Sequence, residues 1–198
     1  GRTDKGVHAY GQCANFKVKE KIANKKKFIN SINFFLQKKF ISILDIKEKD
    51  INFHSRYSAK ERVYEYHIVN RLGSLSIYKN KAWHIKKKLD IKILKKGAEI
   101  LQGEHDFSTF RASSCTAKSP IKKMKLVKIK KSGEKILILF KSKSFLQNQV
   151  RSMVGCLNYI SLKKWTIKKF IKILKSKQRS MCAPPAPAHG LYLKEIKY

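Results

Sequence analysis

Acidic residues are scarce in this chain of 198 residues, which has 13 Asp and Glu against 46 Lys and Arg and a formal net charge of +33. Such an imbalance favours a polyanionic partner, which is RNA, DNA or an anionic membrane surface. Part of the excess fits a general composition rich in Lys, Ile, Asn and Phe, and only seven of the basic residues are Arg. Because Lys contacts phosphates more readily than bases, the charge predicts binding to a nucleic-acid backbone without sequence readout.

Closely spaced cysteines and long apolar runs are also absent from the sequence. No C-x-x-C pair occurs, which argues against a zinc site, and no other metal or cofactor is expected. We expect the thiols to be free in a reducing cytoplasm. No apolar run approaches the roughly 18 residues that a membrane-spanning helix needs. The four cysteines are Cys13, Cys115, Cys156 and Cys182.

The chain lacks an initiator methionine and opens on Gly1-Arg2-Thr3-Asp4-Lys5-Gly6, with no strand or helix before it. We therefore expect it to be a piece of a longer protein. Asp4 lies between two glycines, and this spacing predicts a loop that presents a carboxylate. The alternative is an aspartate that only stabilises the turn by bonding its own backbone.

Apolar periodicity predicts alternating strands and helices along the chain. The apolar run 136–140 should be a central strand, joined to its neighbour by a turn at 132–134. The order of the expected strands and helices predicts an α+β fold of two similar α/β units, at 1–84 and 85–198, with a mostly antiparallel sheet and flanking helices. The expected strands are 11–18, 40–48, 62–70, 81–85, 124–130, 135–141 and 191–196, and the expected helices are 25–36, 89–101, 150–157 and 167–174.

Short motifs across almost the whole chain resemble the bacterial tRNA pseudouridine synthase A family, also called tRNA pseudouridine synthase I. They occur in the family's order. Family members carry a strand and a helix before the first motif, which agrees with the expected truncation. The motifs are GRTDxGVHAxGQ at 1–12, FHxRYSA at 53–59 with YxY at 64–66, GxHDFxxFR at 103–111, KSP at 118–120, FLxxQVRxMVG at 145–155 and GLYL at 190–193.

The resemblance implies a pseudouridine synthase fold and an isomerase that converts uridine to pseudouridine in the anticodon stem-loop of tRNA, at positions 38 to 40. It also implies a cytoplasmic homodimer that needs no cofactor. Two other interpretations stay open on the sequence alone. The chain could be a basic RNA-binding protein without catalysis, or an inactive fragment of the enzyme.

Asp4 is the candidate catalytic residue. Pseudouridine formation breaks the bond from ribose C1′ to N1 of uracil and rejoins the base through C5. This needs a nucleophile that adds reversibly, and a carboxylate is both moderately nucleophilic and a competent leaving group. The resemblance implies this role for Asp4, by attack at C6 of the base or at C1′ of the sugar.

Three further residues are candidates for substrate binding. A cation beside a catalytic carboxylate keeps it ionised and oriented, and the resemblance implies that Arg151 pairs with Asp4, with Gly155 leaving room for a close approach. A solvated helix arginine is the alternative. Tyr64 offers an aromatic ring to stack on a displaced base, although a core tyrosine is also compatible with its strand. Arg2 is expected to contact the RNA backbone or the flipped nucleotide.

Two positions depart from the family's pattern. Lys5 stands where the family usually has Ala and adds a charge beside Asp4. Asn148 takes a place often held by His, so the role of that side chain is open. The six histidines show no metal-ligand spacing. Those in the motif turns are expected to stabilise loops, and they are His8, His54, His105 and His189.

Overall fold

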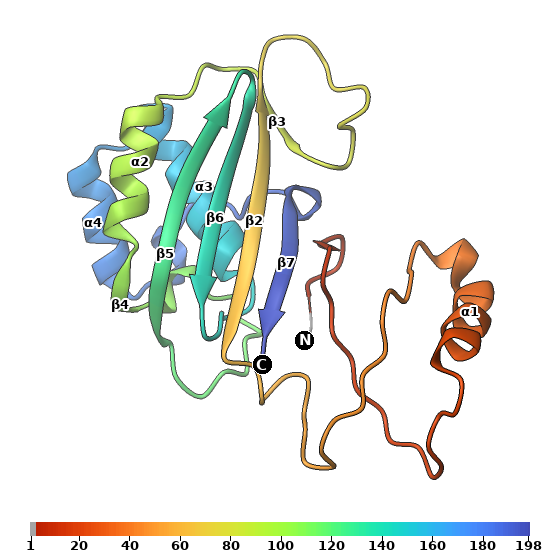
Figure 1. Cartoon of the computed structure of the whole chain (residues 1–198). Coiled ribbons are helices and arrows are strands. Elements are labelled where there is room, and N and C mark those ends of the chain that lie inside the picture. The colour runs from red at the N-terminus through yellow and green to blue at the C-terminus, as the bar shows by residue number, and fades with distance from the viewer. Residues whose placement is uncertain (1–2) are drawn as a thin grey trace. The chain divides into compact units, whose positions relative to one another are not determined.

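The computed structural model describes residues 3–198, which form two compact units (Figure 1). Residues 3–13 and 59–198 make up the larger unit, and residues 14–58 make up the smaller one. The larger unit contains a seven-stranded sheet and the helices α2, α3 and α4. The smaller unit contains helix α1 (Lys25–Leu36), which Asn24 caps by accepting a hydrogen bond from the Lys27 backbone N–H.

The sheet is mixed, with more antiparallel than parallel pairs. Its strands follow the order β1-β7-β2-β6-β5-β4, and β3 pairs with β2. The pairs β1·β7 and β2·β3 are parallel, whereas the described pairs among β2, β4, β5, β6 and β7 are antiparallel. The strands are β1 (His8–Ala9), β2 (Glu61–Asn70), β3 (Trp83–Ile85), β4 (Gly103–Asp106), β5 (Ile121–Ser132), β6 (Lys135–Ser142) and β7 (Leu191–Lys197).

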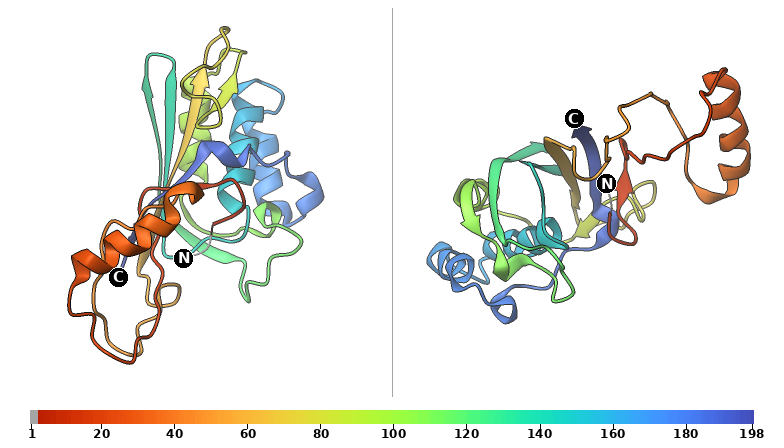
Figure 2. Two further views of the ribbon diagram at one scale, coloured as in Figure 1. Left: turned by 90° about the vertical axis from the view of Figure 1, so that its right-hand side faces the viewer. Right: turned by 90° about the horizontal axis from the view of Figure 1, so that it is seen from below.

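Helices α2 (Ile91–Ile100), α3 (Gln149–Ser161) and α4 (Ile167–Ser176) cover one face of this sheet (Figure 2). β6 sends Ile136, Ile138 and Phe140 into the core between the sheet and the helices. Most residues of α3 are buried, because this helix packs under the sheet and against α2. None of the helices in residues 3–198 is both long and apolar enough to cross a membrane.

Most of the expected elements are confirmed, and so is the α+β class. The helix at 25–36 has the predicted bounds, and the hairpin of β5 and β6 turns at Gly133, whose φ of +55° lies in the left-handed region. The apolar strand β6 is central, between β2 and β5. No sequence pattern predicts the four-residue strand β4, which is completed by its pairing with β5.

Two expected strands are wrong, those at 11–18 and 40–48. Residues 12–18 and 41–48 have no regular secondary structure. An alternating pattern makes a strand only where a partner offers a ladder of hydrogen bonds. In the second segment the side chain of Asn33 takes that place, because it donates to the Ile43 carbonyl at 2.9 Å and accepts from the Ile43 N–H at 2.7 Å.

The expected boundary between two similar units at residue 84 stays a prediction. The sheet itself is continuous across that point, since β2 pairs with β6 on one side and β7 on the other. This continuity brings both ends of the chain to one edge of the sheet, where β1 follows the Asp4 loop and pairs with β7.

Candidate active site

Asp4 begins a tight turn at the edge of the sheet. The Val7 N–H donates to the Asp4 carbonyl at 3.1 Å, and Gly6 has a φ of +80°. A positive φ at the third residue defines a type II turn, which glycine adopts without strain. Lys5 occupies the exposed second position. The turn thus leaves the Asp4 side chain, 27% exposed, free to face a partner across the loop.

The sheet anchors this turn from both sides. β1 pairs His8 with Tyr192 and Ala9 with Leu193 of β7, and the Tyr10 N–H donates to the Leu193 carbonyl at 2.9 Å. Gly6 lies against Ala188, because a Cβ on the glycine would sit 3.4 Å from the Ala188 Cβ. The turn that carries Asp4 therefore packs on the segment that leads into β7.

Arg151 reaches the same place from the first turn of α3. Its Nη1 lies 3.9 Å from Oδ2 of Asp4. Its Nε donates to the Ala186 carbonyl at 2.8 Å, and Nη1 donates to Oδ1 of Asn148 at 3.2 Å. The side chain is only 18% exposed. The guanidinium is consequently fixed beside the carboxylate instead of moving freely in solvent.

Gly155 allows the segment 183–187 to approach α3. A Cβ at this position would lie 2.1 Å from the Pro184 carbonyl oxygen, a distance that no side chain permits. The approach lets the Ala186 N–H donate to the Arg151 carbonyl at 3.0 Å while the Ala186 carbonyl accepts from the Arg151 side chain. The room expected at Gly155 is therefore occupied by the backbone that holds Arg151.

Tyr64 lies on β2 between Leu193 of β7 and Phe140 of β6. Its ring meets Phe145 edge to face, with 5.1 Å between the ring centroids. Burial raises the pKa of Tyr64 to about 12, an effect that Arg62 opposes and the negative charge of Asp4 reinforces. The phenol is therefore neutral near pH 7, and it lies within electrostatic reach of Asp4.

Tyr66, two residues further along β2, has a structural place. It is fully buried, and its hydroxyl donates to the Pro187 carbonyl at 2.8 Å. Its ring fills the space beside Gly190, where a Cβ would lie 2.7 Å from the ring. Tyr66 thus fixes the segment before β7, on which the turn that carries Asp4 packs.

The structure brings together three of the four residues expected at the site: Asp4, Arg151 and Tyr64. Arg2 lies outside the described residues. Sequence reasoning missed Asn148 as a partner of Arg151, because its contact depends on the backbone conformation at the start of α3. Among the histidines expected to stabilise loops, His8 and His105 contact carbonyls of Asn80 and Gln102, and the ring of His54 accepts from the Arg56 N–H.

The arrangement combines a partly exposed carboxylate, a fixed cation and a neutral phenol on an aromatic wall. These groups can attack an electrophilic carbon, place a cation beside the carboxylate, and stack on a planar ring. Residues 3–198 contain no group of three or more His, Cys, Asp or Glu side chains placed to hold a metal ion.

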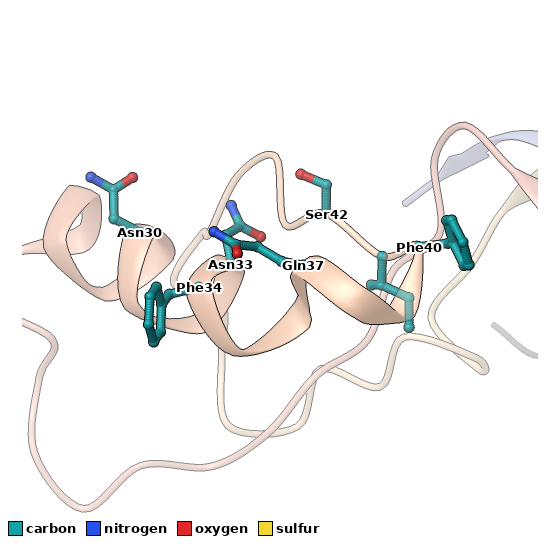
Figure 3. A pocket seen from close by; sticks show the side chains of 7 residues that line it. Asn30, Asn33, Phe34, Gln37, Phe40 and Ser42 are labelled. Atoms are coloured by element: carbon teal, nitrogen blue, oxygen red, sulfur yellow. The ribbon is translucent and has the colours of Figure 1, made fainter.

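A hollow lies in the smaller unit, and its lining differs in character from the Asp4 site (Figure 3). It encloses about 560 Å³ beside α1 and the 3₁₀ turn that follows it. Its lining offers amides, a hydroxyl and apolar side chains but no acid, base or cation, so it lacks the groups that chemistry on a nucleotide needs. The lining residues are Asn30, Asn33, Phe34, Gln37, Phe40, Ile41 and Ser42.

Comparisons with known proteins indicate the family of this chain. The sequence model of a family described as tRNA pseudouridine synthase matches residues 98–198. The tRNA pseudouridine synthase A of Pelagibacter ubique is 57% identical over 198 residues, covering the whole of this chain and 80% of the relative. The enzymes of the same name from Neorickettsia sennetsu and Maricaulis maris are 37% and 36% identical over the whole chain, covering 81% and 79% of their lengths.

Proposed function

This chain belongs to the tRNA pseudouridine synthase A family, and we propose that it isomerises uridine to pseudouridine in tRNA with Asp4 as the nucleophile. The observation that carries the proposal is the ion pair between Asp4 and Arg151, which joins the first motif of the sequence to the fifth. Pseudouridine synthases are isomerases, and the carboxylate on the opening turn is the group suited to their chemistry.

The reaction balances without an oxidant or a cofactor. The carboxylate of Asp4 adds to C6 of the base or to C1′ of the sugar, and the bond from C1′ to N1 breaks. The base turns, C1′ bonds to C5, and the carboxylate of Asp4 is released unchanged. The proton at C5 passes to solvent and N1 gains one, so the product is an isomer of the substrate.

Arg151 and Tyr64 have separate supporting roles in this reaction. The guanidinium stabilises the negative charge each time Asp4 is released from the adduct, and its contacts to Ala186 and Asn148 hold it ready. The target uridine must leave its stack to reach Asp4. The half-buried ring of Tyr64 then packs on the displaced base, and its neutral hydroxyl can donate a hydrogen bond to it.

The tRNA is captured mainly by charge. A net charge of +33 attracts the phosphate backbone, and binding should weaken steeply as salt rises. In line with the family resemblance, we place the target in the anticodon stem-loop at positions 38 to 40, assign Arg2 to the RNA backbone or the flipped nucleotide, and expect a homodimer that works in the cytoplasm without a cofactor. Light scattering of the purified protein measures the dimer directly.

Release of tritium from tRNA transcripts labelled at C5 of uridine tests the reaction. We expect release from a transcript that carries uridine at positions 38 to 40, and none after these positions are changed to cytidine. A basic RNA-binding protein without catalysis would bind both transcripts and release tritium from neither. Release that persists after the changes at 38 to 40 would overturn the assignment to the anticodon stem-loop but not the isomerase activity.

A further inference from the structure

Asn148 has an unusual backbone at the start of α3. Its φ of 61° and ψ of 0° place it in the left-handed region, which Asn tolerates better than most residues. It is the N-cap of the helix, a position where an Asn side chain usually accepts a hydrogen bond from the first turn. Here the side chain makes no such bond. Its amide is thus available for another partner.

That partner is Arg151. Oδ1 of Asn148 accepts from Nη1 of the guanidinium at 3.2 Å. The same Nη1 is the atom that lies 3.9 Å from Oδ2 of Asp4. Because Nη1 carries two hydrogens in the guanidinium plane, a bond from one of them to Asn148 directs the other away from Asn148.

Two anchors fix a planar group more firmly than one. The Ala186 carbonyl holds Nε at 2.8 Å, and Asn148 holds Nη1 at 3.2 Å. Loss of the second anchor would leave the guanidinium free to turn about its bond to Ala186. The 3.9 Å separation from Asp4 would then no longer be maintained.

The backbone around Asn148 is itself held in place by a tight turn before the helix. Oε1 of Gln149 accepts from the Leu146 N–H at 2.8 Å, and the Gln149 N–H donates back to the Leu146 carbonyl at 3.1 Å. The Ala112 N–H donates to the Gln147 carbonyl at 3.0 Å. These bonds close residues 146–149 into a fixed loop, so the backbone that carries the Asn148 side chain is set before any substrate arrives.

We propose that Asn148 is a positioning residue that orients Arg151 toward Asp4 through its side-chain oxygen. The proposal rests on the function proposed above. A neutral amide suits this task, because it accepts a hydrogen bond without bringing a second negative charge that would compete with Asp4 for the guanidinium. The alternative is that Asn148 is present only because asparagine tolerates the left-handed backbone conformation, in which case its side chain has no part in the reaction.

The substitution Asn148→Gly separates these two roles, since glycine keeps the left-handed backbone and removes only the amide. Asn80→Gly is the matched control, because Asn80 also has a positive φ of 58° and offers only its backbone carbonyl to His8. We expect Asn148→Gly to lower kcat for tritium release about tenfold to a hundredfold, as for other residues that orient a functional group. KM should stay within about twofold, because tRNA capture is unchanged. Both variants should unfold at the same temperature as the parent.

A double-mutant cycle with Arg151→Lys identifies the route of the effect. If Asn148 acts through Arg151, adding Asn148→Gly to Arg151→Lys should cost little further activity. Equal kcat for Asn148→Gly and Asn80→Gly would overturn the proposal, and so would a full additional loss in the Arg151→Lys background.

Nitrogen-15 NMR of the Arg151 side chain tests the same contact without activity. A guanidinium anchored at two points should show slow rotation and separate Nη signals in the parent, and these signals should merge in Asn148→Gly. If the parent releases no tritium, the proposed function fails while the NMR comparison still decides whether Asn148 orients Arg151. Merged signals in the parent would overturn the proposed anchoring.

Discussion

Nη1 of Arg151 lies 3.9 Å from Oδ2 of Asp4, although one residue comes from the opening turn and the other from the first turn of α3. The pairing depends on the sheet, because β7 holds the turn through β1 while the segment before β7 holds the arginine. The proposed nucleophile and its cation are therefore held by the same stretch of chain, residues 183–193.

Gly155 is the most sensitive point of this assembly. Gly155→Ala would place a Cβ 2.1 Å from the Pro184 carbonyl, so the segment 183–187 must shift. Overpacking of this kind costs about 1–3 kcal/mol. We expect a lower free energy of unfolding in urea and a loss of tritium release, because Ala186 moves with the segment. Gly73→Ala is the control, since a Cβ there meets nothing within 4 Å. Equal stability of the two variants would contradict the close approach.

Tyr64 should contribute through its ring more than through its hydroxyl. Tyr64→Phe removes one hydrogen bond and should lower kcat/KM about three- to tenfold, whereas Tyr64→Leu removes the stacking surface and should cost more. Because burial raises the pKa of Tyr64 to about 12, ionisation of this phenol should not reduce activity between pH 8 and pH 10. A fall in that range that is present in the parent and absent from Tyr64→Phe would refute this assignment.

Cys156 and Cys182 should differ in reactivity although their sulfur atoms are 3.4 Å apart. The hydrogen bond from Cys156 lowers the pKa of the Cys182 thiol, and Arg179 adds to this effect. The same contact and complete burial raise the pKa of the Cys156 thiol. Iodoacetamide at pH 7.5 should therefore alkylate Cys182 well before Cys156, as followed by peptide mass spectrometry. Arg179→Gln should slow the reaction at Cys182. Faster labelling of Cys156 would show that the pair is arranged differently.

Stability should depend on pH through His67. Burial lowers the pKa of His67, and its contact with Glu65 only partly offsets this. The unfolded chain then binds more protons than the folded protein below about pH 6.5, so the free energy of unfolding is greatest above that pH and falls as the solution is acidified. Urea titrations at pH 5.5 and 7.5 should show this difference, and His67→Gln should reduce it. A difference of unchanged size in His67→Gln would assign the pH dependence to other groups, of which His189 is one because burial lowers its pKa as well.

The sequence predicts those parts of the molecule whose signals are local. The apolar stripe of Phe28, Ile32 and Phe35 predicts helix α1, and the apolar run of β6 predicts a central strand. The strands expected at 11–18 and 40–48 failed because alternation does not supply a partner, and in the second case a single Asn side chain binds the backbone instead.

The candidate site likewise combines residues that local motifs predict with contacts that form only in the folded chain. Motifs identify Asp4, Tyr64 and Arg151, since each belongs to a run whose residue types point to the chemistry. The contact from Asn148 to Arg151 arises from a left-handed backbone and a side chain one helical turn away, and no motif encodes it. The pair of Cys156 and Cys182 likewise forms only when the segment 183–187 returns to α3.

The rate of tritium release by Asp4→Asn under single-turnover conditions tests the central claim most directly. Asp45→Asn is the control, because Asp45 lies on the exposed surface of the smaller unit. If Asp4 is the nucleophile, Asp4→Asn should release tritium at least about a thousandfold more slowly than the parent while it binds tRNA with similar affinity, and Asp45→Asn should match the parent. Release by Asp4→Asn at the rate of the parent would contradict the account.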